Sequence, residues 1–372
     1  SMSRTLLHWW EQCGRRQPDQ KPWMNGPGWS WCRLEQELDP YPIWIAEVML
    51  QQTQLQVVLP YWKRWMACFP TVESLSVASE QDVLRLWQGL GYYARARRIH
   101  QASQLLKEKS WPRTLEGWMA LPGIGRSTAG SILSSAFNFR AAILDGNVKR
   151  VLARVTAFEQ SPARYTGYFW QLSEFLLDPQ RPRDFNQALM DLGATVCMPR
   201  NPHCSECPWR FQCAAYAAGD PRRFPVKDAS KAIPFQVIGV GVVLNSDGEV
   251  LIDQRLNEGL LGGLWEFPGG KQESGEDIEA TVVRELQEEL GIEVAVGECL
   301  LCVDHAYSHK KLRFEVYLCQ WLSGDPQPLA SQQVRWVAPQ NLDQFPFPAA
   351  NTKIIAALRA HLGQAEQSSD MA

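Results

Sequence analysis

The sequence predicts two folded regions of different class, an all-α region up to about residue 225 and an α/β region after it. In the first region apolar residues recur at helical spacing between Gly- and Pro-rich turns. Beyond a linker at residues 226–234 the pattern changes to apolar runs typical of strands. The charge changes at the same place, because residues 1–225 carry 26 Lys and Arg against 19 Asp and Glu, and the remainder carries 11 against 21. A basic region suits a polyanion, and an acidic region suits a metal or a solvated surface.

The length of 372 residues is enough for two or three domains, and we expect them at residues 1–225 and 235–372. No apolar run approaches the length of a membrane span, and no signal peptide precedes the first helix, so we expect no membrane partner. Six of the ten cysteines are scattered in apolar contexts. That usage indicates a reducing compartment rather than a disulfide framework.

The first elements are an amphipathic helix over residues 3–20 and a loop over 21–42 that is rich in Gly, Pro and Trp. An apolar run follows at 43–50, and it holds a single acid, Glu47. Burial of an unpaired carboxylate is costly, so the pKa of Glu47 is predicted to be raised. Such a group can act as a general acid. The alternative is a structural Glu that pairs with a buried Arg.

Residues 54–110 are predicted to carry three or four helices, interrupted by the segment GLGYYARARR at 89–98. Glycines let a backbone approach a ligand closely, while aromatic and Arg side chains can stack on bases and contact phosphates. A solvated basic helix face is the alternative. The alternation of aromatic and Arg residues favours contact with DNA.

The chain is organised around residues 121–150, which begin with the tight turn LPGIG. Gly123 and Gly125 permit backbone angles that a side chain would forbid, and a helix is predicted over 127–139. The N-terminus of such a helix is a site for a phosphate. Asp145 precedes a second helix, predicted over 147–156, whose dipole favours the ionised carboxylate. The alternative is a helical hairpin with an ordinary Asp N-cap.

Four cysteines are grouped as Cys197-x6-Cys204-x2-Cys207-x5-Cys213. Four soft thiolates in one loop suit zinc or a [4Fe–4S] cluster. A zinc ribbon usually pairs two Cys-x2-Cys knuckles, and this spacing does not. The pair at residues 299 and 302, Cys-x2-Cys, lacks a second pair and is predicted to pack within a strand.

In the second region, strands are predicted over 237–244, 249–254 and 312–322. Between them lies the pattern Gly270-x5-Glu-x7-Arg-Glu-Leu-Gln-Glu-Glu-Leu-Gly-Ile. On a helix, three of its acids share one face and three apolar residues face the core: Glu285, Glu288 and Glu289, and Val283, Leu286 and Leu290. Grouped carboxylates repel one another unless a hard cation such as Mg²⁺ or Mn²⁺ lies between them. A Glu-rich surface helix is the alternative.

These motifs resemble known families. Residues 121–150 resemble the helix-hairpin-helix plus Gly/Pro-Asp motif of the endonuclease III superfamily of DNA glycosylases, and the resemblance extends through most of 40–215. It implies a six-helix barrel with a second helical domain that holds a [4Fe–4S] cluster on the four grouped cysteines. Residues 270–292 resemble a complete Nudix box, which implies an α/β Nudix fold. The combination resembles the adenine-specific mismatch glycosylases of the MutY family.

The resemblance implies a monofunctional base-excision enzyme that removes adenine mispaired with 8-oxoguanine or guanine in double-stranded DNA. Glu47 would protonate the adenine and then help to activate water. Asp145 would stabilise the positive charge on the sugar or attack it, and Asn147 would orient Asp145. Relatives that also cleave the strand carry a Lys in the hairpin where this chain has Ser127. With the two hairpin glycines, Ser127 is expected to contact DNA.

Further matched positions imply recognition of the lesion. Gln52 and Tyr92 match residues that wedge into the duplex beside 8-oxoguanine. The family reads 8-oxoguanine with a short aromatic-Ser-His loop, which corresponds here to Tyr307, Ser308 and His309, with Tyr in place of the usual Phe.

The intact Nudix box departs from the family, whose members usually have lost it. The segments FPGGK at 267–271 and FPAAN at 347–351 also resemble MutT, which hydrolyses 8-oxo-dGTP, and Asn351 matches its base-reading Asn. A Mg²⁺-dependent hydrolase acting on an oxidised nucleotide is therefore an alternative or additional function. Residues 329–336 supply no further carboxylate to such a site.

Three other functions stay open: a pyrimidine glycosylase with lyase activity, a non-catalytic binder of damaged DNA, and a nucleotide hydrolase that the helical region recruits to DNA. Ser127 disfavours the first, and the presence of both Glu47 and Asp145 disfavours the second. We expect a monomer in a bacterial-type cytoplasm, associated with the nucleoid through DNA.

Overall fold

The computed structural model describes residues 1–228, 233–259, 261–307 and 310–369. The chain forms two compact units, Ser1–Val77 with Arg98–Ser230, and Ala78–Arg97 with Lys231–Ala372. The boundary at Ser230 falls inside the linker expected at residues 226–234. The grouping of Ala78–Arg97 with the C-terminal unit was not foreseen, since periodicity predicts a helix but not the unit against which it packs.

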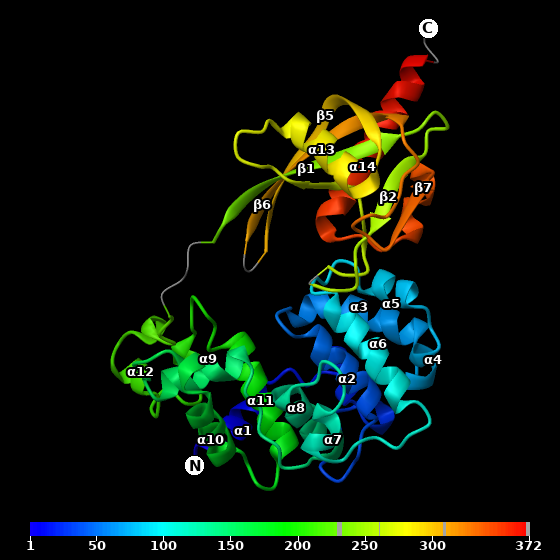
Figure 1. Ribbon diagram of the computed structural model, residues 1–372. Helices are drawn as coiled ribbons and strands as arrows, with labels where there is room; N and C mark the ends of the chain where they lie inside the picture. The colour runs from blue at the N-terminus through cyan, green and yellow to red at the C-terminus, as the bar shows by residue number, and fades with distance from the viewer. Residues whose placement is uncertain (229–232, 260, 308–309, 370–372) are drawn as a thin grey trace. The chain divides into compact units, whose positions relative to one another are not determined.

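The N-terminal part of the chain is helical, as the sequence predicts (Figure 1). Its α-helices are α1 Met2–Cys13, α2 Pro40–Met49, α3 Leu55–Cys68, α4 Val72–Ser76, α5 Glu80–Trp87, α6 Ala94–Leu106, α7 Leu115–Met119, α8 Arg126–Phe137, α9 Gly146–Val155, α10 Thr166–Leu176, α11 Pro182–Thr195 and α12 Ala214–Ala217. The 3₁₀ turns in the described residues are η1 Pro22–Met24, η2 Pro27–Trp29, η3 Pro162–Arg164, η4 Cys204–Glu206, η5 Pro221–Arg223 and η6 Pro339–Gln344. The interval 54–110 thus holds four helices, within the predicted number.

The first helix is shorter than predicted. It ends at Cys13 rather than near residue 20, because Gly14 leaves the helix in an extended conformation and Pro18 follows. The two hairpin helices lie within one or two residues of their predicted bounds. The second of them, α9, begins directly after Asp145, whose side chain accepts a hydrogen bond from the Val148 N–H as an N-cap.

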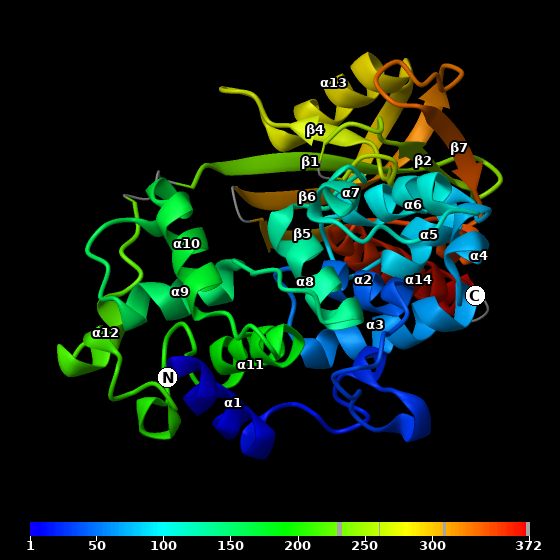
Figure 2. The same ribbon diagram turned by 90° about the horizontal axis from the view of Figure 1, so that it is seen from below.

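Two packing features hold the hairpin in the first unit. Helices α1, α9, α10 and α11 share one core, with fully buried Trp10, Phe169 and Phe185. Helix α8 packs against both α2 and α11 (Figure 2). A Cβ atom on Gly130 of α8 would lie 2.3 Å from the Ala142 carbonyl oxygen. Only glycine therefore lets α8 approach the segment that leads to Asp145.

The second unit contains a mixed sheet whose described strands are β1 Phe235–Leu244, β2 Val250–Gln254, β3 Trp265–Glu266, β4 Gly269–Lys271, β5 Glu293–Ala306, β6 Lys311–Ser323 and β7 Gln333–Val337. Their order is β3-β2-β1-β6-β5, while β4 pairs with β1 and β7 pairs with β2. Strands β1 and β6 run parallel, and β5 runs antiparallel to β6. All three predicted strands are present.

Two helices, α13 Ile278–Leu290 and α14 Ala349–Ser369, cover opposite faces of this sheet (Figure 2). A Cβ atom on Gly241 of β1 would lie 2.9 Å from Leu286 Cδ1, so this glycine admits α13. Leu286 and Leu290 are fully buried as predicted. The prediction for Val283 is wrong: it is 42% exposed, and Val282 takes the core position. A buried stripe shifted by one residue is within the error of a helical pattern read from sequence.

None of the described helices is both long and apolar enough to cross a bilayer. The expected strand packing of Cys299 and Cys302 is also wrong, because both side chains are exposed on β5.

Candidate active site and metal centre

Glu47 lies on α2, whose N-terminus is capped by Asp39. Its neighbours Ala46 and Val48 are buried, and Glu47 itself is half-buried. The pKa of Glu47 is raised to about 7, mainly by burial and to a lesser extent by the nearby charge of Asp145, while Ser131 and Lys21 act in the opposite direction. The raised pKa predicted from the apolar run is therefore confirmed.

A buried polar network near Glu47 was missed in the sequence. Lys21 Nζ donates to Asp191 Oδ1 at 2.8 Å and to Gln187 Oε1 at 2.7 Å. Arg15 Nε also donates to Asp191 Oδ1, at 2.7 Å. Burial lowers the pKa of Lys21, while Asp191 and, more weakly, Glu47 oppose that shift. The signal in the sequence was Asp191, an acid in the apolar run ALMDLG, which is the same kind of signal that identified Glu47.

Asp145 caps α9, and its Oδ1 accepts a hydrogen bond from the Val148 N–H at 2.7 Å. The predicted low pKa is wrong: the pKa of Asp145 is raised, because burial outweighs the N–H groups of Val148 and Asn147 and the charges of Arg150 and Lys149. The side chain is exposed by surface area, but protein atoms crowd around it. This crowding limits how well water solvates the ionised form, which accounts for the raised pKa. Asn147 acts on Asp145 through its backbone N–H.

The hairpin turn has the geometry expected of an anion site. Gly123 has φ of +78°, and a Cβ atom there would lie 2.9 Å from the Arg98 side chain, so only glycine fits. Gly125 is the N-cap of α8 and supplies no side-chain hydrogen bond to the first turn. The Ser127 hydroxyl accepts a hydrogen bond from the Leu144 N–H at 3.0 Å. Ser127 therefore ties the start of α8 to the residue that precedes Asp145.

Gln52 and Tyr92, the two predicted wedge residues, share an unusual backbone conformation. Gln52 has φ of +61° and Tyr92 has φ of +50°. A non-glycine residue in this region costs about 1 kcal/mol or more, and such strain concentrates at ligand-binding sites. Next to Gln52, Gln51 Nε2 donates to Thr128 Oγ1 at 3.1 Å, which joins the end of α2 to α8. The two wedge residues belong to different units.

The four grouped cysteines line one cavity, together with Arg154. Cys197 follows α11, Cys204 begins η4 and Cys207 follows it, and Cys213 precedes α12. Four thiolates around one shared cavity suit a cluster, which spreads its ligands over several irons.

Arg154 is 2% exposed and holds this loop in place. Its guanidinium donates to the carbonyls of Met198 at 2.7 Å, Pro199 at 2.8 Å and Phe224 at 3.0 Å. Another N–H of the same group lies 3.4 Å from Cys197 Sγ. One charged side chain thus satisfies several loop carbonyls that have no helix or strand partner.

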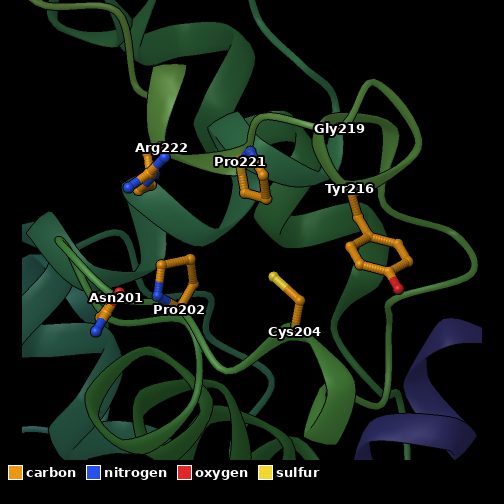
Figure 3. A pocket seen from close by; sticks show the side chains of 7 residues that line it. All are labelled: Asn201, Pro202, Cys204, Tyr216, Gly219, Pro221 and Arg222. Atoms are coloured by element: carbon orange, nitrogen blue, oxygen red, sulfur yellow. The ribbon is translucent and has the colours of Figure 1, made fainter.

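A hollow of about 290 Å³ lies beside the loop (Figure 3). The Cys204 sulfur points into it, between Pro202 and Pro221, and Arg222 and Tyr216 stand at its edge. This cysteine therefore lies between the cavity shared by the four sulfurs and a second opening.

In the second unit, the predicted carboxylate face of α13 is present. Arg284 pairs with Glu276 and Glu285 at 2.8 Å each and with Glu288 at 3.2 Å. Arg284 is therefore the cation that pairs with all three of these acids in the structure. Glu289 lies outside this set, and burial raises its pKa to about 7, with further contributions from Glu285 and Glu266.

Two acids near Glu289 were not foreseen. Asp253 of β2 and Glu266 of β3 are paired in the sheet. Burial raises the pKa of both groups, and for Asp253 the charges of Glu266 and Glu289 add to the effect. Residues 329–336 contain no carboxylate. The structure instead places acids of two neighbouring strands near Glu289.

The remaining predicted residues are placed as follows. Asn351, near the start of α14, is 8% exposed, and its Oδ1 accepts a hydrogen bond from the Phe267 N–H at 3.3 Å. The Tyr307 ring contacts His305 edge-on at 4.6 Å, and its N–H donates to the Lys310 carbonyl at 2.8 Å. Ser308 and His309 lie outside the described residues.

Three family models match this chain. The HhH-GPD superfamily of base excision DNA repair proteins matches residues 45–171, the iron-sulfur binding domain of endonuclease III matches 197–213, and the NUDIX domain matches 239–357. Together they cover both regions identified in the sequence, and the second model contains all four grouped cysteines.

Curated relatives extend the match over nearly the whole chain. The adenine DNA glycosylase of Homo sapiens is 35% identical, over 97% of this chain and 74% of that protein. The adenine DNA glycosylase of Buchnera aphidicola subsp. Baizongia pistaciae is also 35% identical, over 71% of this chain and 72% of its own length. Among solved structures, a thermostable thymine-DNA glycosylase matches 58% of this chain and 95% of its own, with a TM-score of 0.50 and 26% identity.

Proposed function

The chain belongs to the adenine DNA glycosylase family, and we propose that it removes adenine opposite 8-oxoguanine, or opposite guanine, in double-stranded DNA. It is a DNA glycosylase of base excision repair, and it binds a [4Fe–4S] cluster. We assign Cys197, Cys204, Cys207 and Cys213 as the cluster ligands because all four line one cavity. The cluster supplies a structural brace for the loop, and the reaction is carried out by protein side chains.

One observation carries the proposed activity. The pKa of Glu47 is raised to about 7, so this group can exist as a neutral acid near neutral pH, and the charge of Asp145 contributes to the shift. Two carboxyl groups that influence each other can divide the two tasks of glycosidic bond cleavage.

The proposed reaction starts with a flipped-out adenine. Glu47 donates its proton to a ring nitrogen, so that the base leaves as neutral adenine when the bond to the sugar breaks. Asp145 acts as the carboxylate that stabilises the positive charge on the sugar. The Glu47 carboxylate then accepts a proton from the water that attacks the sugar, and the product is an abasic site.

The hairpin supports a reaction that stops at the abasic site. Strand cleavage by this superfamily uses a Lys amine, which forms a Schiff base with the sugar. Ser127 has no amine, and its hydroxyl already accepts the Leu144 N–H. We therefore propose a monofunctional glycosylase.

We propose that DNA contacts involve the hairpin and the strained loops. Free N–H groups at the start of α8, around Gly123 and Gly125, suit a phosphate. Gln52 and Tyr92 remain the proposed wedge residues, and residues 307–309 remain the proposed readers of 8-oxoguanine. Outside the cluster loop the other six cysteines form no disulfide framework, which supports a reducing compartment. We propose that this compartment is the cytoplasm, where the protein acts as a monomer.

The test uses a duplex with a single adenine opposite 8-oxoguanine, labelled on the adenine strand. Cluster-loaded protein is expected to convert the strand into a product that breaks only after treatment with alkali. A duplex with adenine opposite thymine is the control and is expected to stay intact. Breakage without alkali would exclude the monofunctional proposal, and an unchanged strand after alkali would exclude the glycosylase proposal itself.

A second activity is favoured by the acids around Glu289. The charges of Glu266 and Glu289 raise the pKa of Asp253, and Glu266 also raises that of Glu289, although no three acids among the described residues converge on a point that would hold one ion. The charge of these groups on ionisation would attract a divalent cation. We propose that Asn351 contacts the base of the nucleotide. We propose Mg²⁺-dependent hydrolysis of an oxidised nucleoside triphosphate in the second unit.

Incubation with 8-oxo-dGTP and Mg²⁺ is expected to release the nucleoside monophosphate. Glu289→Gln is expected to lower this turnover by about 100-fold, since it removes a proposed metal ligand. Glu279→Gln, on an exposed position of the same helix, is the matched control and is expected to retain turnover. If the unmodified chain releases no monophosphate, the hydrolase proposal is excluded, and DNA recognition remains as the proposed function of the second unit.

A further inference from the structure

An irregularity in β5 brings two cysteine side chains together. In a regular strand, residues three apart point to opposite faces of the sheet. Here Cys299 pairs with Tyr317 of β6, and Leu301 pairs with the very next residue, Val316. One extra residue is therefore inserted in β5 relative to β6, which is the definition of a β-bulge.

The bulge changes which side chains face water. Leu300 and Leu301 both pack against the core of the second unit. Cys299 and Cys302, on either side of them, are both exposed. Their partners on β6, Tyr317 and Glu315, are two residues apart and so point to the same face. The bulge thus converts a spacing that would separate the two cysteines into one that makes them neighbours.

The two sulfur atoms are 3.8 Å apart. A disulfide needs about 2.0 Å, a difference that rotation of two surface side chains can supply without moving buried atoms. Nothing in the proposed glycosylase or hydrolase reactions uses this pair. Bulges recur where a side chain is redirected for a purpose, so the arrangement calls for a chemical explanation.

We propose that Cys299 and Cys302 are an oxidisable dithiol that forms a reversible intramolecular disulfide. The oxidant is a low-molecular-weight disulfide such as glutathione disulfide. One cysteine thiolate attacks it, forms a mixed disulfide and releases one glutathione. The second cysteine then displaces the other glutathione, so the protein loses two protons and two electrons in total, and the glutathione disulfide takes them up to become two molecules of glutathione.

The surroundings slow the reaction of the pair with an oxidant. Burial, Cys299 and the Glu315 carboxylate raise the pKa of Cys302, and Arg313 opposes them. Arg313 is itself bound to Asp304 at 2.8 Å, so its charge is already balanced. Because the thiolate is the reacting form, the pair is a responsive site rather than a fast catalytic one.

The experiment uses the full-length, cluster-loaded chain in buffers of increasing glutathione disulfide to glutathione ratio. Reaction is stopped with acid, free thiols are alkylated, and the peptide that contains both cysteines is identified by mass spectrometry. The expected peptide is lighter by two hydrogen atoms, with alkylation lost at both cysteines together. Cys13 and Cys68, which are exposed and lie on different helices, serve as internal controls. They are expected to carry glutathione instead.

The variants Cys299→Ser and Cys302→Ser sharpen the result. Each leaves one thiol without its neighbour, and that thiol is expected to carry glutathione under conditions that give the internal bond in the unmodified chain. Two outcomes would overturn the proposal. One is glutathione on both cysteines of the unmodified chain, and the other is full alkylation of both cysteines in the most oxidising buffer.

Discussion

The variant Glu47→Gln is expected to release adenine at least about 1,000-fold more slowly than the unmodified chain in a single-turnover assay, because an amide cannot donate the proton. DNA binding is expected to persist. Glutamine has the shape of a protonated glutamic acid, and the pKa of Glu47 near 7 means that a neutral side chain is already tolerated at this half-buried position. The expected loss is therefore in the chemical step and not in substrate affinity.

The same proton makes the rate depend on pH. Glu47 must be protonated to act as an acid, so the rate of the unmodified chain is expected to be full below the pKa of about 7 and to fall as pH rises through it. The variant's residual rate should lack this step. Glu73→Gln, at an exposed position in the same unit, is the matched control and should show the full rate and the unmodified pH profile. Full activity of Glu47→Gln would remove this residue from the mechanism.

Asp145→Asn is expected to lower the single-turnover rate by about 1,000-fold as well, since a neutral amide does not balance the positive charge on the sugar. Helix α9 should survive, because Asn is as good an N-cap as Asp. Asp39→Asn makes the same change at the N-cap of α2 and is the control. It is expected to keep both activity and fold.

Thermal unfolding should distinguish a lost charge from a damaged fold. The pKa of Asp145 is higher in the folded chain than in the unfolded chain, so folding favours its protonated form. Above the folded pKa the ionised group lowers stability, and Asn removes that penalty. The variant is therefore expected to have a Tm equal to or above that of the unmodified chain at neutral pH. A lower Tm with full activity would contradict both parts of this account.

The sequence predicted elements well where a pattern has one physical cause. The apolar run around Glu47 implied burial, and burial is the main cause of its raised pKa. The glycines of the hairpin implied a turn, and Gly123 has the positive φ that needs glycine. The family resemblance identified the cluster loop and the Nudix box, which spacing alone had left open.

The failures arise where two effects compete or where tertiary packing decides. For Asp145, the helix N-terminus and burial shift the pKa in opposite directions, and only the structure shows that burial prevails. The burial of Lys21 could not be predicted from its position in a loop, because its partner, Asp191, is 170 residues away in the chain. The positions of Cys299 and Cys302 depend on a bulge, and a strict two-residue alternation cannot represent an inserted residue.

Helix α9 carries Asp145 at one end and, one and two turns later, Arg150 and Arg154. These arginines bind the carbonyls of Cys197, Met198 and Pro199. The helix has 10 residues and so spans about 15 Å as a stiff rod. Damage to the cysteine loop would remove the contacts that hold the C-terminal part of α9, and Asp145 at the N-terminus of the helix would then be less well positioned. If the cluster were lost by oxidation, we would therefore expect Asp145 to lose its position and the rate of adenine release to fall.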